Sequence, residues 1–180
     1  MSGKMFGALG KNNINIRAIA QGASEMNISA VIDQKDVKKA LNTLHERFFE
    51  GDHKQVNLFI AGVGNVGEKL LVQIKQQRKY LKEHLKLNLR VIGVSNSKKM
   101  YFKSDGMDLK TWKEELKNGE IARLDGFRKK AIDLNLRNSV FVDVTASAAV
   151  SKEYIYYLKE SIAVVACNKI ACSAALEDYQ

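Results

Sequence analysis

Hydrophobic and polar positions along most of the chain follow the two periods of buried strands and amphipathic helices. Apolar runs of strand length occupy four segments, residues 55–61, 89–94, 139–144 and 162–166. Apolar residues at helical spacing run from Val66 to about Leu85, and a further helix is predicted over Ser151–Glu160 with Ser151 as its cap. Strands that alternate with helices in this way predict an α/β fold, a Rossmann-like doubly wound parallel sheet.

The stretch between residues 100 and 138 is polar and irregular. Its pattern predicts only two short helices, over Leu109–Lys117 and Gly126–Leu134. We expect Trp112 to anchor the first of them on the sheet, because a large aromatic side chain gains most from burial.

The first 50 residues follow a different pattern, that of a small α+β module. A helix is predicted over Ser2–Gly10, two strands over residues 15–20 and 28–32, and an amphipathic helix over Gln34–Phe49. One face of this second helix carries Val37, Leu41, Leu44 and Phe48. No strand precedes the first helix, so the module looks partial, and a helix that begins near Ala174 stops at once. We therefore expect a piece of a longer protein, with a first unit over residues 1–52 and a Rossmann unit over residues 53–180.

A glycine motif follows the first strand of the Rossmann unit and opens its first helix. In such a turn Gly62 permits the tight bend, Gly64 lets the backbone approach a pyrophosphate, and Gly67 lets the helix lie close to the strand. The helix N-terminus adds free N–H groups and a positive dipole end. A purely structural glycine turn is the alternative. We predict that a dinucleotide binds at six consecutive residues: Gly62, Val63, Gly64, Asn65, Val66 and Gly67.

The end of the second strand favours NADP over NAD. An acidic residue at this place would bind the ribose 2′-hydroxyl of NAD, and the sequence has none there. It has instead the polar and cationic residues Asn96, Ser97, Lys98 and Lys99, which suit a 2′-phosphate. The alternative is that the two lysines are solvated loop charges, and NAD stays open as a cofactor.

Two later strands end in polar residues at the same carboxyl edge, where open α/β sheets bind ligands. After residues 139–144, we predict that Thr145, Ala146 and Ser147 contact the nicotinamide ribose, while Asp143 could equally be a loop cap. After residues 162–166 come Asn168 and Lys169. A lysine there could place a cation beside a substrate carbonyl or donate a proton, although a surface lysine is nearly as good an explanation.

Composition and charge reduce the number of ligand and partner classes that the chain could bind. The 180 residues are 46% hydrophobic and 27% charged, which is ordinary for a soluble globular protein and excludes a mostly disordered chain. Nearly all of the net charge of +9 comes from residues 75–103, where nine basic side chains stand against Glu83 alone. We interpret most of them, including Lys75, Arg78 and Lys79, as a solvated helix face that attracts a polyanionic ligand. No motif supports nucleic-acid binding, no apolar stretch suits a membrane span, and no His or Cys spacing suits a metal.

Four ordered motifs together resemble the nucleotide-binding half of homoserine dehydrogenase. They are residues 62–67, residues 91–98, residues 142–147 and residues 164–169. The segments 6–9, 15–16, 20–25 and 28–29 resemble the ACT-type regulatory module of an aspartokinase. A chain that runs from one into the other resembles the junction within the bifunctional aspartokinase/homoserine dehydrogenase family, and the resemblance covers nearly all of the sequence.

The resemblance implies NAD(P)-dependent hydride transfer between aspartate 4-semialdehyde and homoserine, on the route from aspartate to threonine and methionine. It places Lys169 near the substrate and the nicotinamide, with a part in proton transfer. It also implies that Asn168 and Lys169 bind the cofactor. Ala166-Cys167 stands where the family usually has Thr-Pro, which removes a rigid turn residue. The substrate and dimerisation domain would follow Gln180 and the kinase domain would precede Met1, so we expect cofactor binding without turnover.

The alternative function is that of an amino-acid-sensing regulatory module with the Rossmann unit as a scaffold. It rests on residues 21–25, a loop between the two N-terminal strands where ACT modules bind an effector or pair with another subunit. We expect a cytoplasmic homo-oligomer in either case.

Overall fold

The computed structural model describes residues 2–22, 27–48 and 53–173. The chain divides into two compact units, one of Met1–His53 with Asn135–Arg137 and one of Lys54–Leu134 with Asn138–Gln180. Each unit has its own hydrophobic cluster. Within the described ranges, no helix combines the length and the apolar character needed to cross a membrane.

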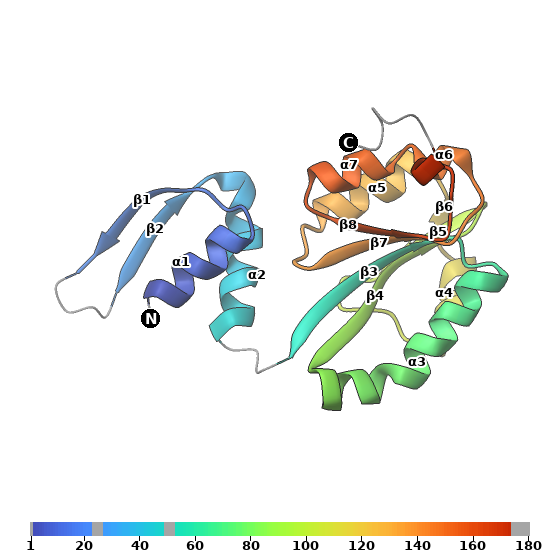
Figure 1. Ribbon diagram of the computed structural model, residues 1–180, viewed down its shortest axis with the longest axis horizontal. Helices are drawn as coiled ribbons and strands as arrows, with labels where there is room; N and C mark the ends of the chain where they lie inside the picture. Colours follow the sequence, from blue (N-terminus) through green and yellow to red (C-terminus); the bar gives the residue numbers. More distant parts are fainter. Residues whose placement is uncertain (1, 23–26, 49–52, 174–180) are drawn as a thin grey trace. The chain divides into compact units, whose positions relative to one another are not determined.

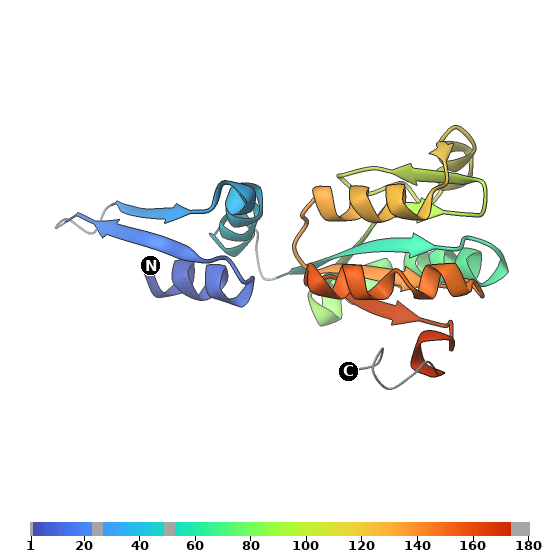
Figure 2. The same cartoon turned by 90° about the horizontal axis from the view of Figure 1, so that it is seen from above.

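The N-terminal unit pairs two helices with a two-stranded antiparallel sheet (Figure 2). Its elements are α1 (Ser2–Lys11), β1 (Ile16–Gln21), β2 (Ile28–Ile32), a 3₁₀ turn (Gln34–Asp36) and α2 (Val37–Phe48). These match the four elements predicted from the sequence. Residues 23–25, most of the loop predicted to bind an effector, lie outside the described residues.

The core of this unit uses a different face of α2 from the one that the apolar pattern indicates. Ala40 packs with Leu9 and Ile14, and Leu44 lies against them. Three of the four residues on the predicted face are exposed: Val37 by 40%, Leu41 by 63% and Phe48 by 36%. The side of α2 that is packed within this unit carries Ala40, Thr43 and Leu44.

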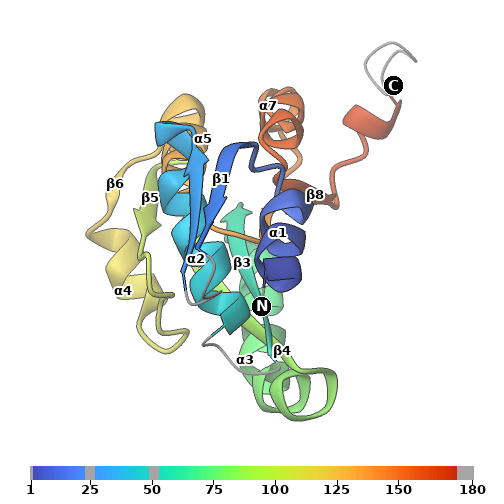
Figure 3. The same ribbon diagram turned by 90° about the vertical axis from the view of Figure 1, so that its left-hand side faces the viewer.

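The second unit is a six-stranded sheet with helices on both faces. Its main elements are β3 (Lys54–Ala61), α3 (Asn65–Leu85), β4 (Leu87–Ser95), β5 (Lys99–Phe102), α4 (Trp112–Lys117), β6 (Glu120–Ile121), α5 (Leu124–Asp133), β7 (Ser139–Asp143), α6 (Ala148–Ser151), α7 (Tyr154–Lys159), β8 (Ala163–Ala166) and a 3₁₀ turn (Ala171–Ser173). The strand order is β6-β5-β4-β3-β7-β8. Helices α3 and α4 cover one face, and α5 and α7 cover the other (Figures 1 and 3).

The alternation of side chains along β3 explains why both faces are covered. Leu58 and Ile60 point to the face of α3 and α4, where Trp112 is buried as predicted. Phe59, between them in sequence, is fully buried on the other face. There it is paired in register with Phe141, whose ring stacks on Tyr157 of α7 at 4.1 Å. A strand buried on both faces is what the continuous apolar run predicts.

Strands β4, β3, β7 and β8 are parallel, which confirms the predicted Rossmann-like sheet. The edge differs from the prediction, because β5 and β6 continue the sheet in antiparallel orientation. Only four and two residues long, they lie in the stretch whose polar composition concealed them. The same stretch holds α4 and α5, close to the two predicted helices.

The prediction of a single helix over Ser151–Glu160 is wrong in its bounds and its cap. The chain forms two short helices there, α6 and α7, and Ser151 ends the first instead of capping a longer one. Its hydroxyl donates to the Ala148 carbonyl oxygen at 2.9 Å. A serine that bonds back to its own turn competes with the backbone and favours the end of a helix.

The aromatic layer under α5 and α7 predicts a large stability loss on truncation. Because Phe141 is 2% exposed and stacks on Tyr157, Phe141→Ala should lower the free energy of unfolding by about 3–5 kcal/mol in a denaturant titration. The matched control is Ile121→Ala at a residue 73% exposed, which should change it by no more than about 0.5 kcal/mol. Similar losses for both variants would contradict this assignment of the core.

Candidate functional site

The glycine turn between β3 and α3 is built around two close backbone approaches. Gly62 has a φ of +93°, and a Cβ there would lie 2.7 Å from Thr145 Cγ2. A Cβ on Gly67 would lie 2.0 Å from the Gly62 carbonyl oxygen. Neither place accepts a side chain, so the turn brings the start of α3 against the end of β3.

Gly64 differs from the other two glycines, because a Cβ there would meet no atom within 4 Å. It immediately precedes α3, a helix of 21 residues. The first-turn residues Asn65 and Val66 are exposed, whereas Val63 packs against the hydrophobic cluster under the sheet. Open space in front of a long helix's first N–H groups is what a phosphate group requires. The turn therefore fits the dinucleotide expected from the sequence.

Backbone hydrogen bonds fix this turn to the strands on either side. The N–H groups of Gly62 and Val63 donate to the Ser95 carbonyl oxygen at the end of β4, at 2.8 and 3.1 Å. The N–H of Val144, just after β7, donates to the Ala61 carbonyl oxygen at 3.0 Å. The carboxyl ends of β4, β3 and β7 thus meet at one point. The connection after β3 leads to β4 and the connection after β7 leads to β8, in opposite directions along the sheet. Open α/β sheets bind ligands at such a switch point.

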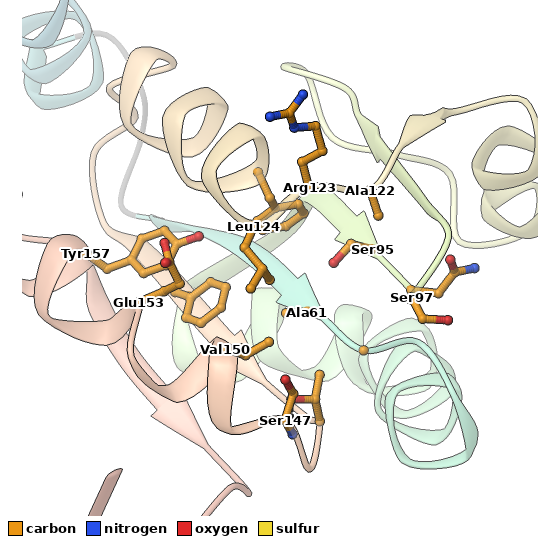
Figure 4. Close-up of a pocket in the computed structure, with 15 residues that line it drawn as sticks. Ala61, Ser95, Ser97, Ala122, Arg123, Leu124, Ser147, Val150, Glu153 and Tyr157 are labelled. Atoms are coloured by element: carbon orange, nitrogen blue, oxygen red, sulfur yellow. Dashed lines mark hydrogen bonds between the residues drawn. The ribbon is translucent and has the colours of Figure 1, made fainter. Parts of the chain in front are cut away.

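A cavity of about 360 Å³ opens at this point. Figure 4 shows Glu153 and Tyr157 at one end and Ser97 at the other, with Leu124 and Ala61 between them. The lining includes five of the residues predicted from the sequence: Gly62, Asn96, Ser97, Thr145 and Ser147. It does not include Lys98, Ala146, Asn168 or Lys169, nor the remaining residues of the glycine motif.

The turn between β4 and β5 gives the two candidate lysines, Lys98 and Lys99, different surroundings. Asn96 Oδ1 accepts the N–H groups of Lys98 and Lys99, at 2.8 and 2.7 Å, and so closes the turn. The Lys99 ammonium donates to the Gly119 carbonyl oxygen at 2.8 Å, which gives it a structural partner. Lys98 and Ser97 are exposed at the tip. Of the two lysines, the structure leaves Lys98 facing solvent.

The loops after β7 and β8 are joined by hydrogen bonds to one another. Thr145 and Ser147 are linked by a bond from the Ser147 N–H to Thr145 Oγ1, at 3.1 Å. The Asn168 amide, which is buried, donates to the Ser147 carbonyl oxygen at 2.9 Å. Lys169 and Ala146 are exposed. Asn168 is thus part of the same loop cluster, while Lys169 lies at its surface.

Pattern reasoning missed the part of the cavity that comes from the start of α5 and from the α6–α7 segment. The missed residues are Ala122, Arg123, Leu124, Phe127, Val150, Glu153 and Tyr157. The N–H of Ala122 donates to the Lys98 carbonyl oxygen at 2.9 Å, which places the exposed Arg123 next to the Lys98 turn. No local signal marks these residues. The pairing of β5 with β4 and of β6 with β5 brings Ala122, Arg123 and Leu124 to the site, while Val150, Glu153 and Tyr157 come from the segment that follows β7.

The far end of the cavity contains a half-buried ion pair and a buried tyrosine. Arg128 Nη1 lies 2.6 Å from Glu153 Oε2, and the Arg128 guanidinium also lies over the Tyr156 ring. Burial, and secondarily the charge of Glu153, raise the pKa of Tyr157 above its ordinary value. This end of the cavity therefore combines apolar side chains with the paired Glu153 carboxylate and a neutral phenol.

Comparison with known families divides the chain in the same two parts. Residues 1–48 match the family described as ACT domain. Residues 62–180 match the family described as homoserine dehydrogenase, NAD binding domain. The second match covers about two thirds of the chain.

Individual relatives agree with these families. The chain is 41% identical over 177 residues to bifunctional aspartokinase/homoserine dehydrogenase 2 of Arabidopsis thaliana, which covers 97% of this chain and 19% of that protein. It spans about a fifth of the length of the curated relatives it matches at similar identity.

Solved structures support the fold. Homoserine dehydrogenase from Thermoplasma acidophilum matches with a TM-score of 0.55 at 19% identity, over 69% of this chain and 39% of that one. A hyperthermophilic archaeal homoserine dehydrogenase mutant in complex with NADPH matches with a TM-score of 0.52 at 21% identity, over 64% and 36%.

The contrast between two glycines of the turn predicts losses of different size for the same substitution. Gly67→Ala should lower the free energy of unfolding by about 1–3 kcal/mol, because its Cβ would overlap the Gly62 carbonyl oxygen. Gly64→Ala enters open space and should cost no more than about 1 kcal/mol. Urea titrations followed by circular dichroism compare the two. Equal stability of the variants would argue against the close approach of α3 to β3.

Proposed function

The chain belongs to the homoserine dehydrogenase NAD-binding domain family, and we propose from this that its carboxyl-edge site binds NADP. The reaction it serves is the interconversion of aspartate 4-semialdehyde and homoserine. The glycine turn carries this proposal, because its open Gly64 and its free helix N-terminus suit a pyrophosphate. We assign the cofactor-binding role to the residues that the sequence predicts on this edge.

The preference for NADP over NAD is supported by the cations around the Lys98 turn. Lys98 lies at its exposed tip, and the backbone bond from Ala122 places Arg123 beside it. Both side chains are long enough to turn toward a 2′-phosphate, and no carboxylate occupies the end of β4. Arg123 already lies 3.4 Å from Asp125, an exposed pair that costs little to break.

Lys169 is the residue that we propose for proton transfer. The cofactor, when bound, supplies or accepts the hydride. In reduction of the aldehyde, the developing alkoxide needs a proton or a nearby cation, and an ammonium group can provide either. Lys169 follows the clamped Asn168 at the carboxyl edge, which supports this role. Since the chain spans about a fifth of its curated relatives, we expect little or no turnover from these 180 residues.

A regulatory role for the first unit is a second proposal, favoured by the ACT-domain match over residues 1–48. An amino acid would bind this unit and not the Rossmann unit. Threonine or lysine should then raise the melting temperature in the absence of NADPH. If only the amino acid and not the dinucleotide did so, the sensing module would replace the dehydrogenase as the main function.

Cofactor binding is the direct test of the site. The 180-residue chain should bind NADPH saturably at or below millimolar concentration, followed by NADPH fluorescence or calorimetry. Gly64→Ala should raise the Kd roughly tenfold, because a methyl group would hold the phosphates away from the backbone. Gly10→Ala, in open space on α1, is the control and should bind normally. A folded chain that shows no saturable binding would refute the proposed function.

The 2′-phosphate assignment is tested by charge reversal at the turn. Lys98→Glu should weaken NADPH binding roughly tenfold and leave NADH binding nearly unchanged, because only NADPH carries the 2′-phosphate. Lys79→Glu, on the exposed face of α3, gives the same change in net charge away from the turn and should affect both dinucleotides little. Equal losses of NADPH and NADH affinity in Lys98→Glu would exclude this role.

A further inference from the structure

Asp143, the last residue of β7, connects three segments of the carboxyl edge. Its side chain is 0% exposed. Oδ1 accepts the N–H of Thr145 at 2.7 Å, and Oδ2 accepts the Tyr154 hydroxyl at 2.5 Å and the Asn168 amide at 3.2 Å. One carboxylate is thus bonded to the loop after β7, to helix α7 and to the loop after β8.

These bonds hold the two loops in one relative position. The Asn168 amide donates to both Asp143 and the Ser147 carbonyl oxygen, while Asn168 Oδ1 accepts the Ile170 N–H at 3.1 Å. The N–H of Cys167 donates to the Asp143 carbonyl oxygen at 2.9 Å. Lys169 therefore lies between two residues that the cluster fixes directly. Loss of the carboxylate would free this loop from the one that carries Thr145 and Ser147.

The side chain of Asp143 has only neutral hydrogen-bonding partners. All three side-chain bonds come from neutral donors, and they use both carboxyl oxygens. Across the described ranges, no basic side chain forms an ion pair with it. Buried charges are usually paired with an opposite charge. A carboxylate held by neutral donors alone can interact with a cation that binds nearby.

Tyr154 keeps its donor role at ordinary pH. It is 8% exposed, and burial together with the bond to Asp143 raises the pKa of its hydroxyl above the ordinary value. The phenol therefore stays protonated and donates to the carboxylate. Its removal as Tyr154→Phe deletes one bond and leaves the charge of Asp143 in place.

We propose that Asp143 is a positioning residue for the nicotinamide end of the cofactor, which ties the Thr145–Ser147 and Asn168–Lys169 loops together and favours the oxidised ring. The inference rests on the proposed function. The oxidised nicotinamide ring is a cation and the reduced ring is neutral, so an unbalanced carboxylate at this edge stabilises the first more than the second. The residue thus acts on the loops and on the balance between cofactor states, with no bond to substrate.

The experiment compares NADP⁺ and NADPH affinities of three variants by calorimetry. Asp143→Asn removes the charge, so its Kd for NADP⁺ should rise roughly fivefold or more beyond any rise for NADPH. Tyr154→Phe loosens the loops but keeps the charge, so both Kd values should rise by the same factor. Tyr156→Phe, at an exposed tyrosine of the same helix, should change neither.

Hydrogen exchange gives a second measurement of the loop coupling. NADPH should protect the amides of residues 166–170 in the wild-type chain, and this protection should be lost in Tyr154→Phe although the rest of the sheet stays protected. Wild-type binding and exchange in Tyr154→Phe would overturn the positioning role. An unchanged ratio of NADP⁺ to NADPH affinity in Asp143→Asn would overturn the effect of charge.

Two further outcomes are decisive. If Asp143→Asn does not fold, Asp143→Ser removes the same charge with a smaller side chain, and an unchanged ratio of NADP⁺ to NADPH affinity in that variant would contradict the effect of charge. If the folded wild-type chain binds neither dinucleotide, the proposed function itself fails. Normal wild-type binding with unaffected variants refutes only the role of Asp143.

Discussion

The close approach of Gly67 to the Gly62 carbonyl oxygen sets the geometry on which the Rossmann unit depends. No side chain fits at residue 67, so α3 begins directly against the end of β3. The same turn is bonded to Ser95 after β4 and lies against Thr145 after β7. The three strand ends therefore converge where the N–H groups of α3 begin. A phosphate site at this place is a consequence of backbone packing more than of any side chain.

The aromatic layer on the face of the sheet covered by α5 and α7 also contributes to the geometry of the site. Phe59 and Phe141 pair across neighbouring strands, and Tyr157 stacks on Phe141 from α7. This packing holds α7 in place, and with it Tyr154, which reaches the Asp143 carboxylate. Stability and site geometry are thus linked, because the helix that completes the core also supplies a donor to the polar cluster at the carboxyl edge.

The two antiparallel edge strands determine one side of the cavity. They are short, yet they turn the chain back so that Ala122 bonds to the Lys98 carbonyl and α5 starts beside the end of β4. Without them, Arg123 and Leu124 would not line the cavity. In the N-terminal unit, by contrast, Val37 and Leu41 of α2 are exposed although the apolar pattern predicts them on a buried face.

The local pattern of the sequence determined most of the secondary structure of the Rossmann unit. Apolar runs and glycine spacing sufficed for the parallel strands, for α3 and for the turn at residues 62–67, because these depend on neighbours within a few residues. Tertiary structure decided the rest. The Lys99 ammonium bonds to the Gly119 carbonyl oxygen, whereas Lys98 is exposed. The helix predicted over Ser151–Glu160 is divided in two, and hydrogen bonds join Asp143 to Tyr154 and Asn168. These outcomes depend on burial and on hydrogen bonds between segments distant in sequence, which no local pattern encodes.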